Sequence, residues 1–199
     1  MTSVAIIDGG GANIASLQFA LQRLGAQSEL TTDKDTIRSA ERVILPGVGA
    51  AADAMQRLQQ AELVELIPTL QQPLLGICLG MQLLFDSSEE EDAQCLGIMA
   101  GRARLFETAP DQPVPHMGWN TVSHTGQSPL LQDIPDGAYF YFVHSYAVDV
   151  VATTIGSTAY GRDFTAITAQ DNFMGTQFHP ERSGQWGSQL LKNFLQLGD

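Results

Sequence analysis

The chain has 199 residues, 44% of them hydrophobic, which is enough to bury a full core, and we expect a single domain over residues 1–199. Its formal net charge is −12 with only ten Lys and Arg residues, which argues against nucleic-acid binding, because that depends on clustered positive charge. No apolar stretch approaches the length of a membrane span, and the apolar run at 4–7 is too short for a signal peptide. With two cysteines that suit a reducing compartment, these features predict a cytoplasmic globular protein.

The first eighty residues alternate short apolar runs with helical patterns. Continuous apolar runs are typical of parallel strands covered on both faces, and their alternation with helices indicates an α/β fold with a parallel sheet. Strands are predicted at 4–7, 28–31, 43–45 and 74–77. Helices are predicted at 14–24, after an N-cap at Asp33, and at 79–85, and a helix-rich segment is predicted from Ala50 towards Ile67.

The second half of the chain changes to closely spaced strand patterns separated by turns. Strands are predicted at 101–106, 119–123, 139–143, 146–150, 153–158, 164–169 and 173–178, and an amphipathic helix at 186–197. We therefore expect an open, mostly parallel sheet with flanking helices and a mixed or antiparallel extension.

A cysteine between glycines follows the fourth apolar run. Gly76-Ile77-Cys78-Leu79-Gly80 places it at a strand-to-helix junction, which is the pattern of a nucleophile elbow with cysteine in place of serine. The glycines are expected because so tight a turn leaves room only for hydrogen. Unpaired N–H groups at the start of the helix would favour the thiolate form of Cys78. From this pentapeptide alone, a buried structural cysteine is equally consistent.

A histidine and a glutamate follow the last predicted strand, in Gln177-Phe178-His179-Pro180-Glu181. An imidazole can take the proton of a thiol and later protonate a leaving amine, provided that a third group orients its ring. Taken alone, His179 is more typical of a strand-end histidine with an ordinary hydrogen bond, and Glu181 of a residue that balances a helix dipole. Together with Cys78 they indicate a Cys-His-Glu triad.

A glycine-rich segment, Pro46-Gly47-Val48-Gly49, follows the third predicted strand. A tetrahedral intermediate needs backbone N–H groups directed at its negative oxygen. We expect one donor from Leu79 and the other from the peptide at Val48 and Gly49; an ordinary proline-glycine turn is the alternative. These segments all lie past the carboxyl end of a strand, where open α/β sheets bind ligands.

Five segments together are similar to one known family. Residues 46–49, 76–82 and 177–183 resemble the signatures of class I (triad-type) glutamine amidotransferases, whose fold is flavodoxin-like. Two further segments, PHMGWN at 115–120 and YFVHSY at 141–146, resemble the glutaminase subunits of imidazole glycerol phosphate synthases in histidine biosynthesis. The resemblance runs from the first strand to the last helix.

The resemblance implies a glutaminase mechanism. Cys78 would attack the side-chain amide of glutamine, His179 would move the proton and Glu181 would orient His179, before water releases glutamate and ammonia. Family positions that hold glutamine are matched by Gly47, Gln82, Glu90, Ser145 and Tyr146. Without the resemblance, the acidic run at 89–92 predicts only a solvated loop or helix end.

The resemblance also implies a partner. Ammonia would pass to a cyclase with a (β/α)8 barrel, which makes imidazole glycerol phosphate and an aminoimidazole carboxamide ribotide. Asn13 and Trp119 match positions at the cyclase interface, although a buried core position is an equal alternative for Trp119 from sequence alone. No cofactor is expected. A metal site is not expected either, because the four histidines are dispersed and no C-x-x-C occurs.

Three other functions are weighed against this one. A nucleotide-binding module could use Gly9 to Gly11, but Ile14 stands where the third glycine of a dinucleotide fingerprint belongs. A catalytically silent scaffold could hold a cyclase without chemistry. A related amidotransferase subunit could serve another acceptor synthase, since one subunit does not show the acceptor directly.

Overall fold

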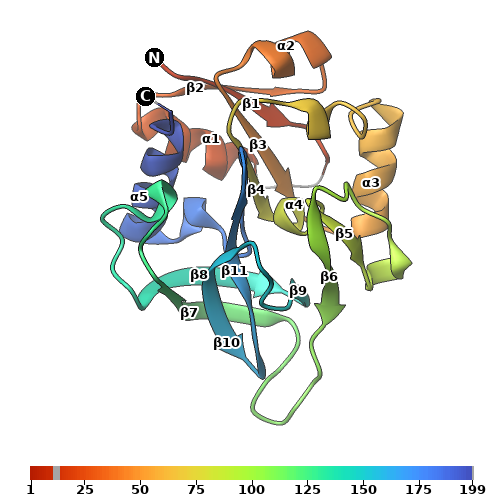
Figure 1. The fold of residues 1–199 in the computed structure, drawn as a ribbon, viewed down its shortest axis with the longest axis vertical. Helices are drawn as coiled ribbons and strands as arrows, with labels where there is room; N and C mark the ends of the chain where they lie inside the picture. Colours follow the sequence, from red (N-terminus) through yellow and green to blue (C-terminus); the bar gives the residue numbers. More distant parts are fainter. Residues whose placement is uncertain (11–13, 199) are drawn as a thin grey trace.

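A nine-stranded sheet forms the centre of the molecule, and helices cover both of its faces (Figure 1). The computed structural model describes residues 1–10 and 14–198, and over these residues the strand order is β2-β1-β3-β4-β12-β11-β10-β7-β8. The first five strands in this order are parallel: β2 (Gln27–Thr31), β1 (Ser3–Ile7), β3 (Arg42–Gly47), β4 (Leu74–Cys78) and β12 (Phe173–Thr176).

The rest of the sheet is antiparallel. Beyond β12 come β11 (Arg162–Gln170), β10 (Thr154–Tyr160), β7 (His116–His124) and β8 (Ala138–His144). A second, three-stranded sheet contains β5 (Phe85–Ser88), β6 (Met99–Leu105) and β9 (Tyr146–Val148). The predicted parallel α/β core with an antiparallel extension is confirmed.

Alternation of side chains along the parallel strands divides the core into two layers. In β1, Val4 and Ile6 belong to one layer, and Ala5 and Ile7 to the other. The first layer is closed by α1 (Ile14–Arg23) and α5 (Gly184–Leu195), and the second by α2 (Lys34–Ser39), α3 (Ala51–Gln60) and α4 (Leu79–Gln82). Because both faces are covered, the central strands β1, β3 and β4 are mostly apolar, whereas the edge strand β2 is polar and largely exposed. Short 3₁₀ helices occur at η1 (Ile67–Thr69), η2 (Glu90–Asp92), η3 (Pro129–Leu131) and η4 (Pro180–Arg182).

The helix predicted at 79–85 is too long. It ends at Gln82, and Phe85 begins β5, where it pairs with Met99. Leu83, Leu84 and Phe85 are all buried, so their pattern suits a buried helix and a buried strand equally well. The pairing of Phe85 with a strand distant in sequence decides between the two.

The helix-rich segment predicted from Ala50 towards Ile67 contains α3 and reaches η1. The helix α3 ends at Gln60, and Glu62 then adopts a φ of 54°, outside the helical region. The N–H of Leu63 closes this turn by donating to the carbonyl of Leu58. The N-cap predicted at Asp33 is confirmed, since its side chain accepts the N–H of Thr36 at 2.8 Å.

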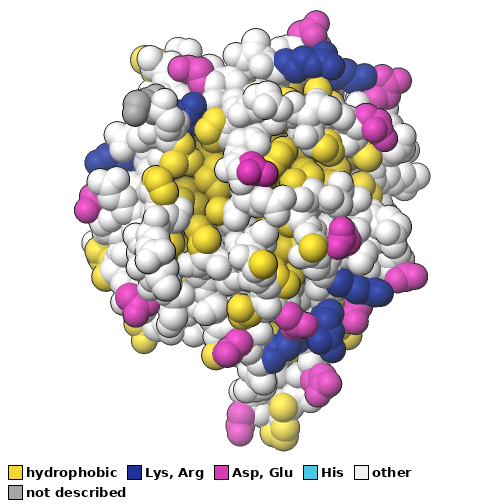
Figure 2. All heavy atoms as spheres, in the orientation of Figure 1, with side chains coloured by type: hydrophobic (Ala, Val, Ile, Leu, Met, Phe, Trp, Pro, Cys, Tyr) yellow, Lys and Arg dark blue, Asp and Glu magenta, His cyan; other side chains and the backbone are white. Residues whose placement is uncertain are grey.

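Hydrophobic side chains gather across the middle of the face shown in Figure 2, and charged side chains lie mainly around its rim. The basic groups on this face are few and lie among acidic ones. Within residues 1–10 and 14–198, no helix is long and apolar enough to cross a membrane.

Glycines let α4 lie directly against β3 and β4. A Cβ on Gly80 would stand 1.8 Å from the carbonyl oxygen of Leu45, and one on Gly76 would stand 2.6 Å from the carbonyl oxygen of Gly80. A Cβ on Gly47 would meet the Gly80 nitrogen at 2.7 Å. The elbow glycines are therefore required by the close approach of backbones, as the sequence predicts.

We expect Gly80→Ala to lower the free energy of unfolding by about 1–3 kcal/mol or more, because the new methyl group overlaps a backbone carbonyl that cannot move alone. Urea unfolding followed by circular dichroism measures the change. Gly9→Ala is the matched control, since its Cβ would meet the Pro46 oxygen at an ordinary 3.9 Å. Equal stability of the Gly80→Ala variant and the wild type would contradict the packing argument.

Candidate active site

Cys78, His179 and Glu181 lie together although they come from distant parts of the chain. Cys78 ends β4 with φ 54° and ψ −111°, a conformation that non-glycine residues rarely adopt and that is typical of functional sites. The Nδ1 atom of His179 is 2.8 Å from Oε1 of Glu181, and His179 and Cys78 line the same cavity. The sulfur thus lies beside the imidazole rather than among apolar side chains alone.

The surroundings of His179 favour its charged form. Burial lowers the pKa of His179, but its hydrogen bonds to Cys78 and Glu181, and their charges, outweigh burial and raise the pKa to about 10. The side chains of His179 and Glu181 are only 10% and 6% exposed, so solvent screens the pair weakly. A protonated imidazole beside a sulfur can protonate a leaving amine.

A cavity of about 300 Å³ opens at Cys78. It is lined by Val48, Gly49, Cys78, Leu79, Gln82, Glu90, Pro115, Val143, His144, Ser145, Tyr146 and His179. Residues predicted for three different roles therefore line one cavity. These roles are the nucleophile and its base, the oxyanion donors, and the glutamine-binding positions.

The predicted oxyanion donors lie around this cavity. β3 ends at Gly47, which is paired in parallel register with Cys78, and the chain then passes the cavity at Val48 and Gly49. Gly49 has a φ of +91°, a conformation that favours glycine. Leu79 is the first residue of α4, where helix N–H groups have no partner within the helix. Gly47 itself lines an adjoining cavity of about 110 Å³, together with His179 and Glu181.

Glu90 reaches the cavity from η2. Its Oε2 atom accepts the N–H of Ala51 at the start of α3, at 2.8 Å, and its own N–H donates to Ser88 Oγ at 3.1 Å. Burial raises the pKa of Glu90, and the hydrogen bond from Ala51 opposes this rise. Its neighbours Glu89 and Glu91 are exposed, as the sequence predicts for this acidic run, but Glu90 is half-buried.

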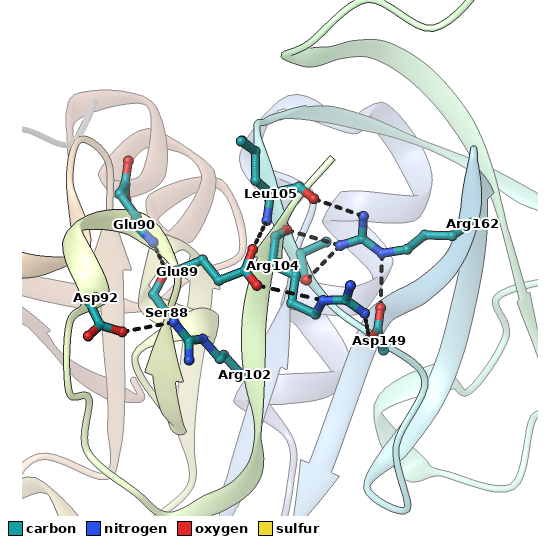
Figure 3. A network of polar contacts seen from close by, with 10 residues as sticks. Ser88, Glu89, Glu90, Asp92, Arg102, Arg104, Leu105, Asp149 and Arg162 are labelled. Carbon is teal, nitrogen blue, oxygen red and sulfur yellow. Dashed lines mark hydrogen bonds and ion pairs between the residues drawn. The ribbon is translucent and has the colours of Figure 1, made fainter. Parts of the chain in front are cut away.

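A network of ion pairs fixes the segment around η2 (Figure 3). Glu89 accepts the N–H of Leu105 at 2.9 Å and lies 3.8 Å from Nε of Arg104. Arg104 and Arg162 each contact Asp149 at 2.9 Å. Such partly exposed pairs contribute little individually to stability, so the main effect of the network is to tie η2 to β6 and β11.

The family model described as glutamine amidotransferase class-I matches residues 5–197. The chain belongs to the class-I glutamine amidotransferases. It is 52% identical over 197 residues to imidazole glycerol phosphate synthase subunit HisH of Xylella fastidiosa (strain Temecula1), covering 99% of this chain and 98% of the relative. It is 48% identical over 200 residues to HisH of Vibrio parahaemolyticus, covering 98% of each. The resemblance stated from the sequence is confirmed.

Two solved structures share the fold of this amidotransferase at low sequence identity. One, described as a glutamine amidotransferase, has a TM-score of 0.74 and 16% identity, and the match covers 96% of each chain. The other, from Thermoplasma acidophilum, has a TM-score of 0.75 and 18% identity over 98% of this chain and 92% of that chain. Membership of this family argues against a nucleotide-binding module, and the HisH relatives argue against another acceptor synthase.

The two residues predicted at the partner interface have different outcomes. Trp119 lies on β7 and is 55% exposed, so the alternative of a buried core tryptophan is wrong. Its ring lies 6.1 Å from that of Tyr141 on β8. Asn13 lies outside the described residues, as does Gly11 of the glycine run.

Sequence reasoning missed several residues at the site of this amidotransferase. His144, Pro115 and Val143 line the cavity, and Nε2 of Gln177 lies 3.7 Å from the sulfur of Cys78. Gln177 stands two residues before His179, and alternate residues of an extended segment point the same way. That spacing is the signal that could have identified Gln177.

We expect Glu181→Gln to lower the pKa of His179, because the variant keeps the size of the side chain but removes its charge. NMR titration of the imidazole protons measures the shift, with His179→Gln used for assignment.

The raised pKa of His179 also makes the free energy of unfolding depend on pH. Since this pKa is higher in the folded state than its usual 6.5, the contribution of the charged imidazole to stability is complete below pH 6.5 and is lost as the pH rises through about 10. A wild-type His179 that titrates near pH 6.5 would contradict this electrostatic account.

Proposed function

We propose that this protein hydrolyses glutamine to glutamate and ammonia in the histidine pathway, with Cys78 as the nucleophile. The observation that carries the proposal is that Cys78 and His179 line one cavity, with Nδ1 of His179 hydrogen-bonded to Glu181. HisH relatives that match nearly the full chain support the same activity. We further propose that residues 1–199 act as one domain and that the reaction takes place in the cytoplasm, where the thiol stays reduced.

Catalysis begins with attack of the Cys78 sulfur on the side-chain carboxamide carbon of glutamine. The negative charge that develops on the amide oxygen meets the N–H groups of Leu79 and of the peptide at Val48 and Gly49. His179, held by Glu181, then protonates the departing nitrogen. Ammonia is released, and the glutamyl group remains bound to Cys78 as a γ-glutamyl thioester.

Hydrolysis of the thioester reverses the roles. His179 accepts a proton from water, which attacks the thioester carbon, and the Cys78 sulfur leaves with glutamate as the product. Gln82 and Glu90, with the backbone at Ser145 and Tyr146, are the groups that hold the glutamine skeleton in the cavity. The sum is one glutamine and one water converted to one glutamate and one ammonia.

The ammonia is delivered to a partner cyclase subunit, for which we propose a (β/α)8 barrel. The relatives are named as subunits of a synthase, which supports a partner. Direct delivery has a physical reason, because ammonia in neutral water is mostly protonated and only the neutral form is a nucleophile. The surface that suits the partner is on β7 and β8, where Met117, Trp119 and Tyr139 are 67%, 55% and 58% exposed.

We expect Cys78→Ala to abolish glutamine-dependent synthesis by the complex with its cyclase, while synthesis from added ammonium salt is retained. The alanine variant removes the nucleophile but keeps the small volume of the side chain. Glutamate release and imidazole glycerol phosphate formation measure the two activities. Full glutamine-dependent activity of this variant would instead support the silent scaffold.

We expect Trp119→Ala to weaken binding of the cyclase by roughly 30-fold or more, which is typical of a central aromatic residue in an interface. Isothermal titration of the two subunits measures the dissociation constant. Val150→Ala is the control, because Val150 is 51% exposed but lies outside β7 and β8. Equal losses of affinity in both variants would contradict the assignment of this surface.

A further inference from the structure

A chain of buried polar side chains runs behind the candidate active site. Nε2 of Gln177 donates to the sulfur of Cys78 at 3.7 Å, and Oε1 of Gln177 accepts from Nε2 of Gln82 at 3.0 Å. Gln82 also donates to the backbone oxygen of Tyr146 at 2.8 Å. Gln177 is fully buried and Gln82 nearly so, at 0% and 3% exposure.

Two histidines continue the chain on the other side of the Tyr146 carbonyl. Nδ1 of His144 lies 2.8 Å from this oxygen, and Nε2 of His144 lies 3.0 Å from Nδ1 of His116. Nε2 of His116 in turn lies 3.4 Å from Nδ2 of Asn120 on β7. Both histidine side chains are buried.

Every bond in this chain has one allowed direction. A carbonyl oxygen only accepts, so Nδ1 of His144 carries the hydrogen. Burial lowers the pKa of His144 to about 3 and that of His116 to about 4, so both rings are neutral at neutral pH and each has a single N–H. Nε2 of His144 therefore accepts from His116, and Nε2 of His116 accepts from Asn120.

The same reasoning fixes the orientation of the side-chain amides of Gln82 and Gln177. Because Gln82 must turn its NH₂ group towards the Tyr146 oxygen, it presents an N–H to Oε1 of Gln177. Gln177 must then turn its own NH₂ group towards Cys78. Gln82 itself lines the cavity.

We propose that Gln177 is a positioning residue that holds the Cys78 sulfur in line for attack, and that His116 and His144 fix the orientation of its partner Gln82. The inference rests on the proposed glutaminase activity and goes beyond the triad, because none of these three side chains takes part in bond making. An N–H that points at sulfur stabilises the thiolate and restricts its rotation, and hydrogen bonds to charged groups are about twice as strong as neutral ones.

Gln177→Met tests the first part, because methionine has a similar shape but no amide. We expect kcat/KM for glutamine to fall by roughly 10- to 100-fold. We also expect alkylation of Cys78 by iodoacetamide, followed by mass spectrometry of the peptide that contains it, to slow by roughly tenfold. Mere loosening of the site would expose the sulfur and speed alkylation instead.

Gln170→Met is the matched control. It makes the same chemical change at a half-buried glutamine of β11 whose amide bonds to the Ile98 carbonyl at 3.1 Å and does not line the cavity. We expect this variant to keep wild-type alkylation and turnover. Wild-type values for Gln177→Met, or an equal loss in Gln170→Met, would overturn the role of Gln177.

A pair of substitutions at His116 tests the second part. His116→Phe keeps the ring, which stacks on Tyr160 at 4.0 Å and on Phe142 at 5.1 Å, but leaves His144 without a donor. We expect KM for glutamine to rise roughly 3- to 10-fold with a smaller change in kcat. His116→Asn places an N–H near the position of Nδ1 and should recover much of this loss. Unchanged KM in the phenylalanine variant would overturn the role of the pair.

The outcomes separate this inference from the proposed function. If the wild-type complex releases no glutamate from glutamine, the proposed function fails, whatever the variants do. If the wild type is active and the Gln177→Met and His116→Phe variants match it, only the positioning role fails. The alkylation rates are read without glutamine, so they report on the sulfur even when turnover cannot be compared.

Discussion

The close approach of α4 to β3 and β4 is the constraint on which the rest of the site depends. With no side chain at Gly76 or Gly80, the chain can turn within one residue from a buried strand into a helix. This turn gives Cys78 a positive φ of 54°, and Cys78 lines the cavity together with Leu79 and Val48. The positions of the proposed nucleophile and of one proposed oxyanion donor are thus set by the backbone, which is more rigid than any side chain.

Burial and pairing have opposite effects on the pKa of His179, and the effect of pairing is larger. Removal of water alone would keep the imidazole neutral, as it does at His116 and His144, where burial lowers the pKa. At His179 the neighbouring sulfur and the carboxylate of Glu181 reverse the direction of the shift. Histidines in one molecule therefore differ in charge: the environment beside Cys78 favours the charged imidazole, and the environment behind it favours the neutral one.

The sequence was sufficient to predict the parallel core, the antiparallel extension and the residues that meet at the cavity, because strand order and the carboxyl edge follow from chain topology. It did not predict where α4 ends, since Leu83 to Phe85 are buried in either conformation. It also missed Gln177 and the His116–His144 pair. Their roles come from contacts between strands distant in sequence, such as the pairing of β7 with β8, which places His116 opposite His144.

The hydrogen-bond chain and the proposed partner surface share β7. Side chains alternate along a strand, so Trp119 points to solvent while its neighbour Asn120 begins the chain that leads to Cys78. Coupling between distant sites requires an element with two arrangements, each favoured by a different state. The hydrogen-bond chain allows only one arrangement of its donors and acceptors. The Tyr146 carbonyl can only accept, and each donor that leads to it has an acceptor. In the role proposed for it, this hydrogen-bond chain holds the site in one geometry rather than switching it.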